Sequence, residues 1–230
     1  MLIDIFANVL IDIFANMGNQ LKNINASAII FDDHRLFADS FSSLIERLEL
    51  FQSVHAFHSE PELRHFFIRN THLRVYLFLD YYLKDKNALS VINEVKRLNK
   101  RVSFIVVSSV TNPITIANIL TYNPDGFISK SSGFDILVQC IKAINGGNVY
   151  RCPVIEQIIA TTAVVENISF TAREIEILQY FALGFSITET ADRLHLSKHT
   201  VVAHRRNMMS KAQVNSIIEL LTYARNYDLI

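Results

Sequence analysis

Several features that would assign a protein to a class are missing from this 230-residue chain. Its two cysteines, Cys140 and Cys152, are too few for a disulfide framework or a cysteine metal site, so we interpret them as small buried thiols in a reducing compartment. No stretch reaches the roughly 18 uninterrupted apolar residues of a membrane span. The apolar N-terminus lacks the basic start and the small-residue cleavage site of a signal peptide. We therefore expect a soluble, cytoplasmic protein.

A net charge is also missing, because 22 lysines and arginines balance 22 aspartates and glutamates. Acidic residues are absent from one segment in particular, which runs from Arg193 to Ile218. Its positive charges are on Arg193, Lys198, Arg205, Arg206 and Lys211, and three histidines, His195, His199 and His204, lie among them. In an otherwise neutral chain, this basic segment indicates a surface that binds DNA.

The first 25 residues form a leader that contains a tandem repeat. The sequence LIDIFAN occurs at residues 2–8 and again at residues 10–16. On a helix, the polar residues Asp4, Asn8, Asp12 and Asn16 would form one stripe with apolar residues around it. Such a helix favours docking or dimerisation, but we prefer the interpretation that the leader is a duplication without a specific task.

Residues 26–147 alternate between apolar runs and amphipathic segments. The runs predicted as strands are 28–31, 53–57, 75–79, 104–107 and 126–128, and the segments predicted as helices are 36–48, 61–69, 88–99, 113–121 and 134–144. Continuous apolar runs are typical of strands that are buried on both faces of a parallel sheet. Their alternation with helices predicts a doubly wound α/β domain with a five-stranded, flavodoxin-like parallel sheet.

Polar side chains follow four of these strands, at the edge where an open α/β sheet places its functional site. They are Asp32 and Asp33 after the first strand, Asp80 after the third, Ser108 after the fourth and Lys130 after the fifth. Carboxylates that share a crevice repel one another, and oxygen ligands favour Mg2+ as the cation that neutralises them. Asp80 is then placed to attack a phosphoryl group whose oxygens Ser108 and Lys130 contact. Taken singly, each residue also fits a helix cap or a solvated loop.

Capping signals in residues 168–230 predict a domain of four short helices. The pairs Thr171–Glu174 and Ser186–Glu189 have the spacing of capping boxes, and Ser197 is placed to cap the third helix. Gly184 ends the first helix, and the short turn at 195–197 separates the second helix from the third. This arrangement predicts a helix-turn-helix unit.

The third of these helices has an inner and an outer face. The inner stripe is Val201, Met208 and Ala212, with His204 beside it, and the outer face carries His199, Val202, Ala203, Arg206 and Ser210. In a major groove, Val202 and Ala203 would touch thymine methyl groups and Arg206 would bond the edge of guanine. The residues placed for phosphate contacts are Lys198, Thr200, Arg205 and Lys211. A merely solvated basic face is the alternative.

The remaining segments are a last helix and a linker. The last helix spans about 216–227 and presents Ile217, Leu220, Leu221 and Ala224 on one side. Residues 148–167 contain Pro153 and little periodicity, which predicts a linker between the two domains.

The residues above resemble a known family. Residues 27–148 resemble the receiver domain of two-component response regulators, and residues 168–230 resemble the LuxR-type helix-turn-helix of the NarL/FixJ family. Within that family, the sequence NMMSKAQV followed by IIELLTYARNYDLI is most similar to the FimZ and SsrB type of regulator.

The resemblance implies a role for each residue of the strand-edge cluster. It implies that Asp32 and Asp33 help to bind Mg2+, that Asp80 accepts the phosphoryl group, and that Ser108, Lys130 and the aromatic switch Phe127 respond to it. For the C-terminal domain it implies base contacts by Val202, Ala203 and Arg206. It also implies that two copies pair through the last helix on a twofold-symmetric site.

The loop after Asp80 departs from the family's pattern. It reads DYYLKDKNAL, with Lys84 where the family has proline and without the glycine that usually follows. Tyr82 would supply only a backbone carbonyl to the metal, so its side chain does not prevent Mg2+ binding. We expect Tyr81 and Tyr82 to narrow the access to the site, and the Lys84 ammonium to replace part of the metal's charge.

We interpret the chain as a dimeric, sequence-specific transcription regulator, not an enzyme, that a sensor histidine kinase or a small phosphodonor phosphorylates on Asp80. Phosphorylation would draw Ser108 and Phe127 toward the site and shift the population toward a dimer or a released DNA-binding domain. One alternative uses the receiver only for phosphorylation-independent dimerisation. A weaker one is an aspartate-nucleophile phosphohydrolase, which needs two acids two residues apart, whereas Asp32 and Asp33 are adjacent.

Overall fold

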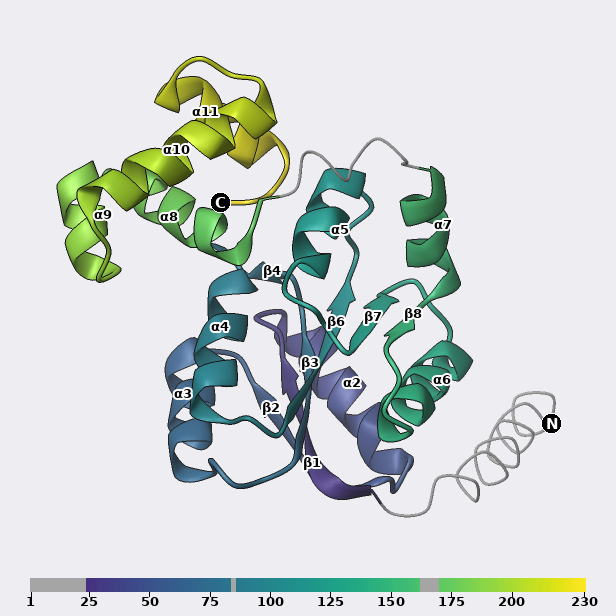
Figure 1. Cartoon of the computed structure of the whole chain (residues 1–230). Helices are drawn as coiled ribbons and strands as arrows, with labels where there is room; N and C mark the ends of the chain where they lie inside the picture. The colour runs from purple at the N-terminus through teal and green to yellow at the C-terminus, as the bar shows by residue number, and fades with distance from the viewer. Residues whose placement is uncertain (1–23, 84–85, 162–169) are drawn as a thin grey trace. The chain divides into compact units, whose positions relative to one another are not determined.

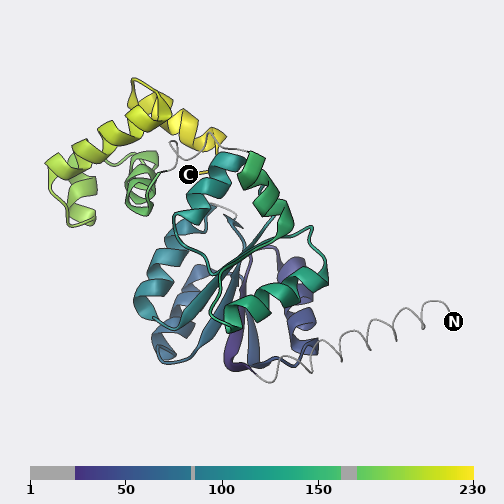
Figure 2. The same cartoon turned by 45° about the vertical axis from the view of Figure 1, so that its right-hand side comes forward.

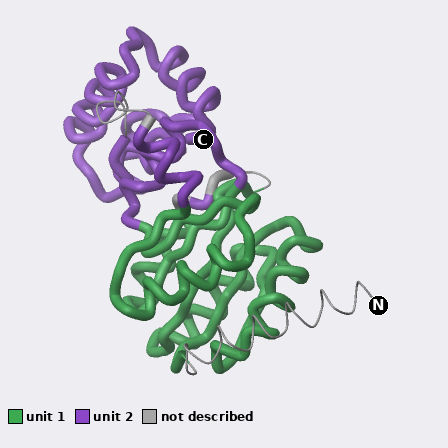
Figure 3. Tube along the Cα trace, turned by 90° about the vertical axis from the view of Figure 1, so that its right-hand side faces the viewer, with its two compact units in different colours: residues 1–84, 91–108, 124–152 green, residues 85–90, 109–123, 153–230 purple. Residues whose placement is uncertain are grey.

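The structure is a computed structural model that describes residues 24–83, 86–161 and 170–230. The described residues divide into two compact units (Figure 3), of which the first contains those within 1–84, 91–108 and 124–152 and the second those within 85–90, 109–123 and 153–230. The leader repeat and Lys84 lie outside the described residues, so what we expect of them stays a prediction.

The first unit is built on a parallel sheet with the strand order β2-β1-β3-β6-β7-β8 (Figure 1). The strands are β1 (Ile24–Phe31), β2 (Phe51–Phe57), β3 (Val75–Leu79), β6 (Val102–Ser108), β7 (Gly126–Ser129) and β8 (Tyr150–Arg151). Every residue of β3 is buried, and the register places Leu77 of β3 opposite Phe104 of β6. Strands that are apolar on both faces need a layer of helices on each side, which explains the doubly wound arrangement.

The sheet has six strands, so the prediction of five is wrong. The additional strand, β8, comes from the segment predicted as a linker and pairs in parallel with β7, where Tyr150 lies opposite Gly126. The Cys152 N–H extends this pairing by donating to the Phe127 carbonyl at 2.9 Å. A two-residue strand at the sheet edge has no hydrophobic period, so the sequence pattern does not reveal it. The same segment also holds helix α7 (Pro153–Thr161).

Helices cover both faces of this sheet. They are α2 (Arg35–Arg47), α3 (Glu60–Arg69), α4 (Leu89–Leu98) and α6 (Phe134–Asn145), with α2 and α6 on one face and α3 and α4 on the other (Figure 1 and Figure 2). Ala38 and Ile45 are buried on the inner side of α2, two helical turns apart, as the amphipathic pattern predicts. The predicted helices are present, with ends that differ by a residue or two, the usual uncertainty of a helix boundary.

The second unit is built mainly of helices. They are α5 (Pro113–Leu120), α7, α8 (Ala172–Ala182), α9 (Ile187–Arg193), α10 (Lys198–Ala212) and α11 (Ile217–Asn226). Asn112 caps α5, because its Oδ1 accepts the Ile114 N–H at 2.9 Å, and Pro113 fits the first turn, where an N–H would have no helical partner. The four helices predicted for residues 168–230 correspond to α8, α9, α10 and α11.

Neither a membrane-spanning helix nor a disulfide is found in the described part of the chain. No helix there is long and apolar enough to cross a membrane. Cys140 and Cys152 are free and buried, which confirms their interpretation as buried thiols. Burial raises the pKa of the Cys140 thiol to about 12, so this thiol stays protonated and unreactive at neutral pH.

Candidate functional site

The carboxyl ends of the strands bring two acids and one cation together in the first unit. Asp32 follows β1, Asp80 follows β3 and Lys130 follows β7, as the strand-edge prediction requires. The Lys130 Nζ donates to Asp32 Oδ2 at 2.7 Å and to Asp80 Oδ2 at 2.8 Å. Both carboxylates are almost fully buried, with 1% of Asp32 and 3% of Asp80 exposed. One ammonium therefore bridges two buried acids.

Burial and hydrogen bonding shift the pKa values of Asp80 and Lys130 in this crevice. Burial raises the pKa of the Asp80 carboxyl, and the hydrogen bond from Lys130 only partly offsets that effect. Burial alone would lower the pKa of Lys130, but its hydrogen bonds to the two aspartates outweigh burial, so its pKa is raised. Lys130 thus stays charged while Asp80 is held in an unfavourable environment for its negative charge.

Two carboxylate oxygens of the crevice accept no hydrogen bond in the described structure, although His34 Nδ1 lies 3.2 Å from one of them, Asp33 Oδ1. Asp33 Oδ1 and Asp80 Oδ1 are buried and accept no hydrogen bond there. Asp32 Oδ1 accepts the His34 N–H at 2.8 Å. One carboxylate oxygen from each of Asp32, Asp33 and Asp80 and one ring nitrogen of His34 lie within 4.8 Å of one another. The arrangement fits a divalent cation, because a cation would satisfy the buried oxygens that Lys130 leaves unpaired.

The other predicted residues of the strand edge are also in place. Ser108, at the end of β6, is fully buried and lies opposite Ser129 of β7, and its carbonyl accepts the Lys130 N–H at 2.9 Å. Phe127 is fully buried inside β7. The register therefore holds Ser108 and Lys130 on the same edge of the sheet, on neighbouring strands.

The altered loop after Asp80 contributes two short paired strands. Its strands are β4 (Tyr82–Leu83) and β5 (Lys86–Asn87). Tyr81 is buried, and its ring packs edge-on against the Tyr82 ring, with centroids 5.1 Å apart. The sequence pattern did not predict these strands, because two-residue strands are too short to show a period.

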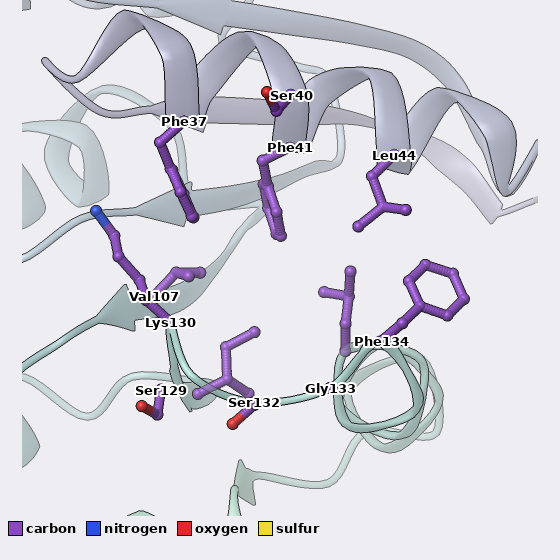
Figure 4. A pocket seen from close by; sticks show the side chains of 12 residues that line it. Phe37, Ser40, Phe41, Leu44, Val107, Ser129, Lys130, Ser132, Gly133 and Phe134 are labelled. Atoms are coloured by element: carbon purple, nitrogen blue, oxygen red, sulfur yellow. The ribbon is translucent and has the colours of Figure 1, made fainter.

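An apolar cavity of about 260 Å3 lies beside the crevice, between α2 and α6. Figure 4 shows Phe37, Phe41 and Leu44 pointing from α2 into this pocket, with Lys130 at the end near Phe37 and Phe134, at the start of α6, at the other end. Lys130 Nζ lies 4.2 Å from the centroid of the Phe37 ring. A cation over an aromatic face is attracted by the ring quadrupole, so Phe37 helps to hold the Lys130 ammonium between the two aspartates.

In the second unit, both predicted capping boxes are formed. Thr171 Oγ1 accepts the Glu174 N–H at 3.2 Å, while Glu174 Oε2 accepts the Thr171 N–H at 2.8 Å. The second pair repeats these contacts at the start of α9, where Ser186 and Glu189 are bonded at 3.2 and 2.8 Å. These reciprocal bonds fix the points at which α8 and α9 begin.

The turn between α9 and α10 is tight. Leu196 N–H donates to the Ala191 carbonyl at 2.9 Å, and His195 has the left-handed φ of 52°. Ser197 then caps α10, because its Oγ accepts the Thr200 N–H at 3.1 Å, as predicted. Gly184 ends α8 with a φ of 85°, a conformation that glycine adopts without strain. α9 and α10 therefore form the predicted helix-turn-helix.

Two of the three residues predicted for the inner stripe of α10 are buried, and the third, Ala212, is half-buried. Val201 and Met208 are fully buried on its inner side. The outer residues that are exposed are Lys198, His199, Ala203, Arg206 and Ser210, and those that are half-buried are Thr200, Val202 and Arg205. The outer face is therefore exposed at five of these eight residues, and it carries basic and small side chains.

Lys211 differs from the other basic residues of this segment. Its Nζ donates to Glu174 Oε2 at 2.7 Å, and Glu174 is only 3% exposed. Because the same Glu174 oxygen closes the capping box of α8, Lys211 joins the end of α10 to the start of α8. The structure therefore places Lys211 in an ion pair inside the domain.

The comparisons with known proteins agree with this geometry. The model of the LuxR family of bacterial regulatory proteins matches residues 168–224. Residues 168–224 are a LuxR-family domain. The matched residues of this LuxR-family domain contain α8, α9, α10 and most of α11, including the tight turn and both capping boxes.

The similarity extends beyond the LuxR-family domain. The Fimbriae Z protein of Salmonella typhimurium is 25% identical over 213 residues, which are 89% of this chain and 99% of that protein. The transcriptional regulatory protein RcsB of Escherichia coli (strain K12) is 24% identical over 211 residues, which are 89% of this chain and 96% of that protein.

A solved structure shares the fold of both parts. It is RcsB from Salmonella enterica serovar Typhimurium, bound to promoter P1flhDC in the presence of the phosphomimetic BeF3−. The match has a TM-score of 0.62 and 25% identity, and it covers 88% of this chain and 100% of that chain. The chain therefore has the fold of RcsB along most of its length.

Proposed function

We propose that this chain is a two-component response regulator that binds specific DNA sequences through α10 under the control of phosphorylation at Asp80. The observation that carries the proposal is the exposed basic outer face of α10, which a capped helix-turn-helix presents in a LuxR-family domain. The similarity to RcsB, which was solved on promoter DNA, and to the Fimbriae Z protein supports it.

On DNA, the outer face of α10 enters the major groove. The small side chain of Ala203 allows a close approach, Val202 contacts a thymine methyl group, and the exposed Arg206 bonds guanine. The phosphate contacts come from Lys198, His199, Thr200 and Arg205. Lys211 has its ammonium on Glu174, so its main contribution is to the stability of the domain.

Two copies of the chain pair through α11. Ile218 of this helix is 74% exposed, although Leu220 and Ala224 on its inner side are fully buried. An exposed branched apolar side chain on a helix that already has a buried face favours contact with a partner. Pairing of two such domains requires two DNA half-sites related by twofold symmetry.

In the receiver, Asp80 attacks the phosphorus of a phosphohistidine or of a small phosphodonor. The bond from phosphorus to the donor breaks as the bond to the Asp80 oxygen forms, so the product is an acyl phosphate and the leaving group takes up a proton. Lys130 then neutralises a phosphoryl oxygen, and the Ser108 hydroxyl donates a hydrogen bond to another.

The proposed cofactor of this step is Mg2+, bound by Asp32, Asp33, Asp80 and the backbone carbonyl of Tyr82. The buried Asp33 Oδ1 and Asp80 Oδ1, which lack hydrogen bonds in the described structure, support a cation at this position. A bound Mg2+ supplies positive charge to the phosphoryl oxygens in the transition state.

Helix α5 connects phosphorylation to the LuxR-family domain. It follows Ser108 in the chain, and its fully buried Asn118 accepts the Phe170 N–H at 2.7 Å. Thr115 Oγ1 donates to the Tyr227 carbonyl at the end of α11, also at 2.7 Å. We propose that these bonds hold α11 away from a second copy, and that movement of Ser108 after phosphorylation loosens them.

Two measurements test the function. Incubation with acetyl phosphate and Mg2+ should give a phosphorylated species on a phosphate-affinity gel for the wild-type chain and for Asp39→Asn, a control that changes an exposed carboxylate of α2, but not for Asp80→Asn. Selection of binding sites from random DNA should give a twofold-symmetric sequence. A wild-type chain that remains unphosphorylated, or that selects no sequence, contradicts the corresponding half of the proposal.

A second candidate is the same DNA-binding regulator with a receiver that works without phosphorylation. It is favoured by one observation, namely that Lys130 already bridges Asp32 and Asp80. Calorimetric titration with Mg2+ separates the two candidates. Binding that Asp80→Asn abolishes supports phosphorylation, whereas a wild-type chain that binds no Mg2+ and does not respond to beryllofluoride supports the second candidate.

A further inference from the structure

His34 lies beside the acidic crevice and is not one of the proposed Mg2+ ligands. Its backbone N–H donates to Asp32 Oδ1 at 2.8 Å, which turns the residue toward that carboxylate. Its ring Nδ1 lies 3.2 Å from Asp32 Oδ1 and 3.2 Å from Asp33 Oδ1. The imidazole therefore already stands between two of the acids.

Lys130 and His34 contact different carboxylate oxygens of the crevice. Lys130 takes the Oδ2 atoms of Asp32 and Asp80. His34 Nδ1 lies 3.2 Å from the Oδ1 atoms of Asp32 and Asp33, and one ligand atom from each of these residues and from Asp80 lies within 4.8 Å of the others. Asp80 is 3% exposed, and its Oδ1 accepts no hydrogen bond within the described chain, so this group includes a residue with a buried anionic oxygen that lacks a hydrogen bond.

The size of this group fits a small cation. Metal–ligand bonds of about 2.0–2.2 Å to nitrogen and oxygen allow two ligand atoms to lie up to about 4.4 Å apart on opposite sides of the ion. The 4.8 Å spread in the structure needs to shrink only slightly to reach that limit. The His34 side chain is 69% exposed, so its ring can adjust toward an ion without disturbing the core.

We propose that His34 Nδ1 is a metal ligand, and that through it the crevice prefers a first-row transition ion of borderline softness over Mg2+. Imidazole nitrogen strengthens the binding of ions such as Co2+ and Zn2+, whereas Mg2+ takes oxygen ligands and keeps much of its water. Three carboxylate oxygens and one imidazole nitrogen thus bind both kinds of ion but favour the transition ion. The inference rests on the proposed function only in that Asp32, Asp33 and Asp80 bind a divalent cation.

The test is calorimetric titration of the full chain with Co2+ and with Mg2+, accompanied by the visible absorption spectrum of bound Co2+, which responds to a nitrogen ligand. The variant is His34→Gln, which keeps the backbone N–H bond to Asp32. The matched control is His58→Gln, because His58 Nδ1 also lies 3.2 Å from an Asp32 oxygen, but that oxygen is the backbone carbonyl. Asp33→Asn locates the bound Co2+ in the crevice.

The wild-type chain and His58→Gln should bind Co2+ at least about tenfold more tightly than Mg2+. His34→Gln should lose about tenfold or more of the Co2+ affinity and shift the Co2+ spectrum, with Mg2+ affinity changed less than threefold. Asp33→Asn should weaken both ions. Equal Co2+ affinity in wild type and His34→Gln overturns the inference and leaves the Mg2+ site intact, as does an equal loss of both ions in His34→Gln. A chain that binds neither ion overturns the inference together with the proposed cation site, and Co2+ binding that Asp33→Asn does not change overturns the assignment to the crevice.

Discussion

Replacement of Asn118 by alanine should loosen the hold of α5 on the LuxR-family domain. The fully buried Asn118 side chain accepts the Phe170 N–H at 2.7 Å and donates to the Ile114 carbonyl, also at 2.7 Å. Its removal leaves the buried Phe170 N–H without a partner, which costs about 1–3 kcal/mol in the docked state. Once the domain is released, water satisfies that N–H and the cost disappears.

Because the substitution destabilises only the docked state, it should increase the DNA affinity of the unphosphorylated chain. A cost of about 1–3 kcal/mol changes the ratio of docked to released domains by roughly 5- to 150-fold, since about 1.4 kcal/mol corresponds to a factor of ten. Fluorescence anisotropy with a selected DNA site measures the change. Asn118→Ala should bind more tightly than the wild-type chain without a phosphodonor, and beryllofluoride should then add little.

The control is Asn99→Ala, which removes a buried asparagine of the first unit. Asn99 donates to the carbonyls of Asn70 and Leu73 at 3.2 and 2.9 Å, so its loss also destabilises the protein but breaks no bond to the LuxR-family domain. It should lower the melting temperature without improving DNA binding. If Asn118→Ala leaves DNA affinity unchanged, or if Asn99→Ala raises it equally, the proposed role of α5 is refuted.

Three further predictions concern single side chains. Arg206→Ala should weaken binding to the selected site by about 1–3 kcal/mol in anisotropy titrations, and unchanged binding would count against the assigned groove face. Lys211→Met should lower the free energy of unfolding, measured by urea denaturation, by about 3 kcal/mol, because it leaves Glu174 buried without its cation. A loss of DNA affinity without a loss of stability would contradict this prediction. Asp80→Asn should raise the melting temperature of the metal-free protein more at pH 7.5 than at pH 4.5. The raised pKa of Asp80 means that the folded state holds the Asp80 proton more tightly than the unfolded state does. The carboxyl group therefore lowers the stability of the fold as pH rises above the ordinary aspartate pKa. An increase in melting temperature that is the same at both pH values would contradict the reasoning.

The sequence predicted the main elements because their signals are local. β3 was predicted with its observed bounds, since all five residues are apolar and buried on both faces. The capping boxes at Thr171 and Ser186 were predicted because each contact spans only three residues. β8 was missed because its stability comes from pairing with β7, which is not visible in two residues of sequence.

Within the candidate site, topology predicted positions but not contacts. Parallel strands bring Asp32, Asp80 and Lys130 to one edge whatever their side chains do, so their proximity followed from the strand order. The position of the His34 ring depends on a side-chain direction that no periodicity encodes. The only signal for it in the sequence is that His34 directly follows the acidic pair Asp32 and Asp33. The pairing of Lys211 with Glu174 joins two helices, and a helical wheel describes only one helix at a time.

The central claim is that α10 binds DNA under the control of Asp80, and one anisotropy experiment tests it directly. A labelled duplex that carries the selected site is titrated with the full chain, with and without Mg2+ and beryllofluoride, for the wild type and for Asp80→Asn. The account predicts that beryllofluoride tightens binding by the wild-type chain about tenfold or more and leaves Asp80→Asn unchanged. Equal affinity of the wild-type chain under both conditions, or an equal response of Asp80→Asn, would contradict it.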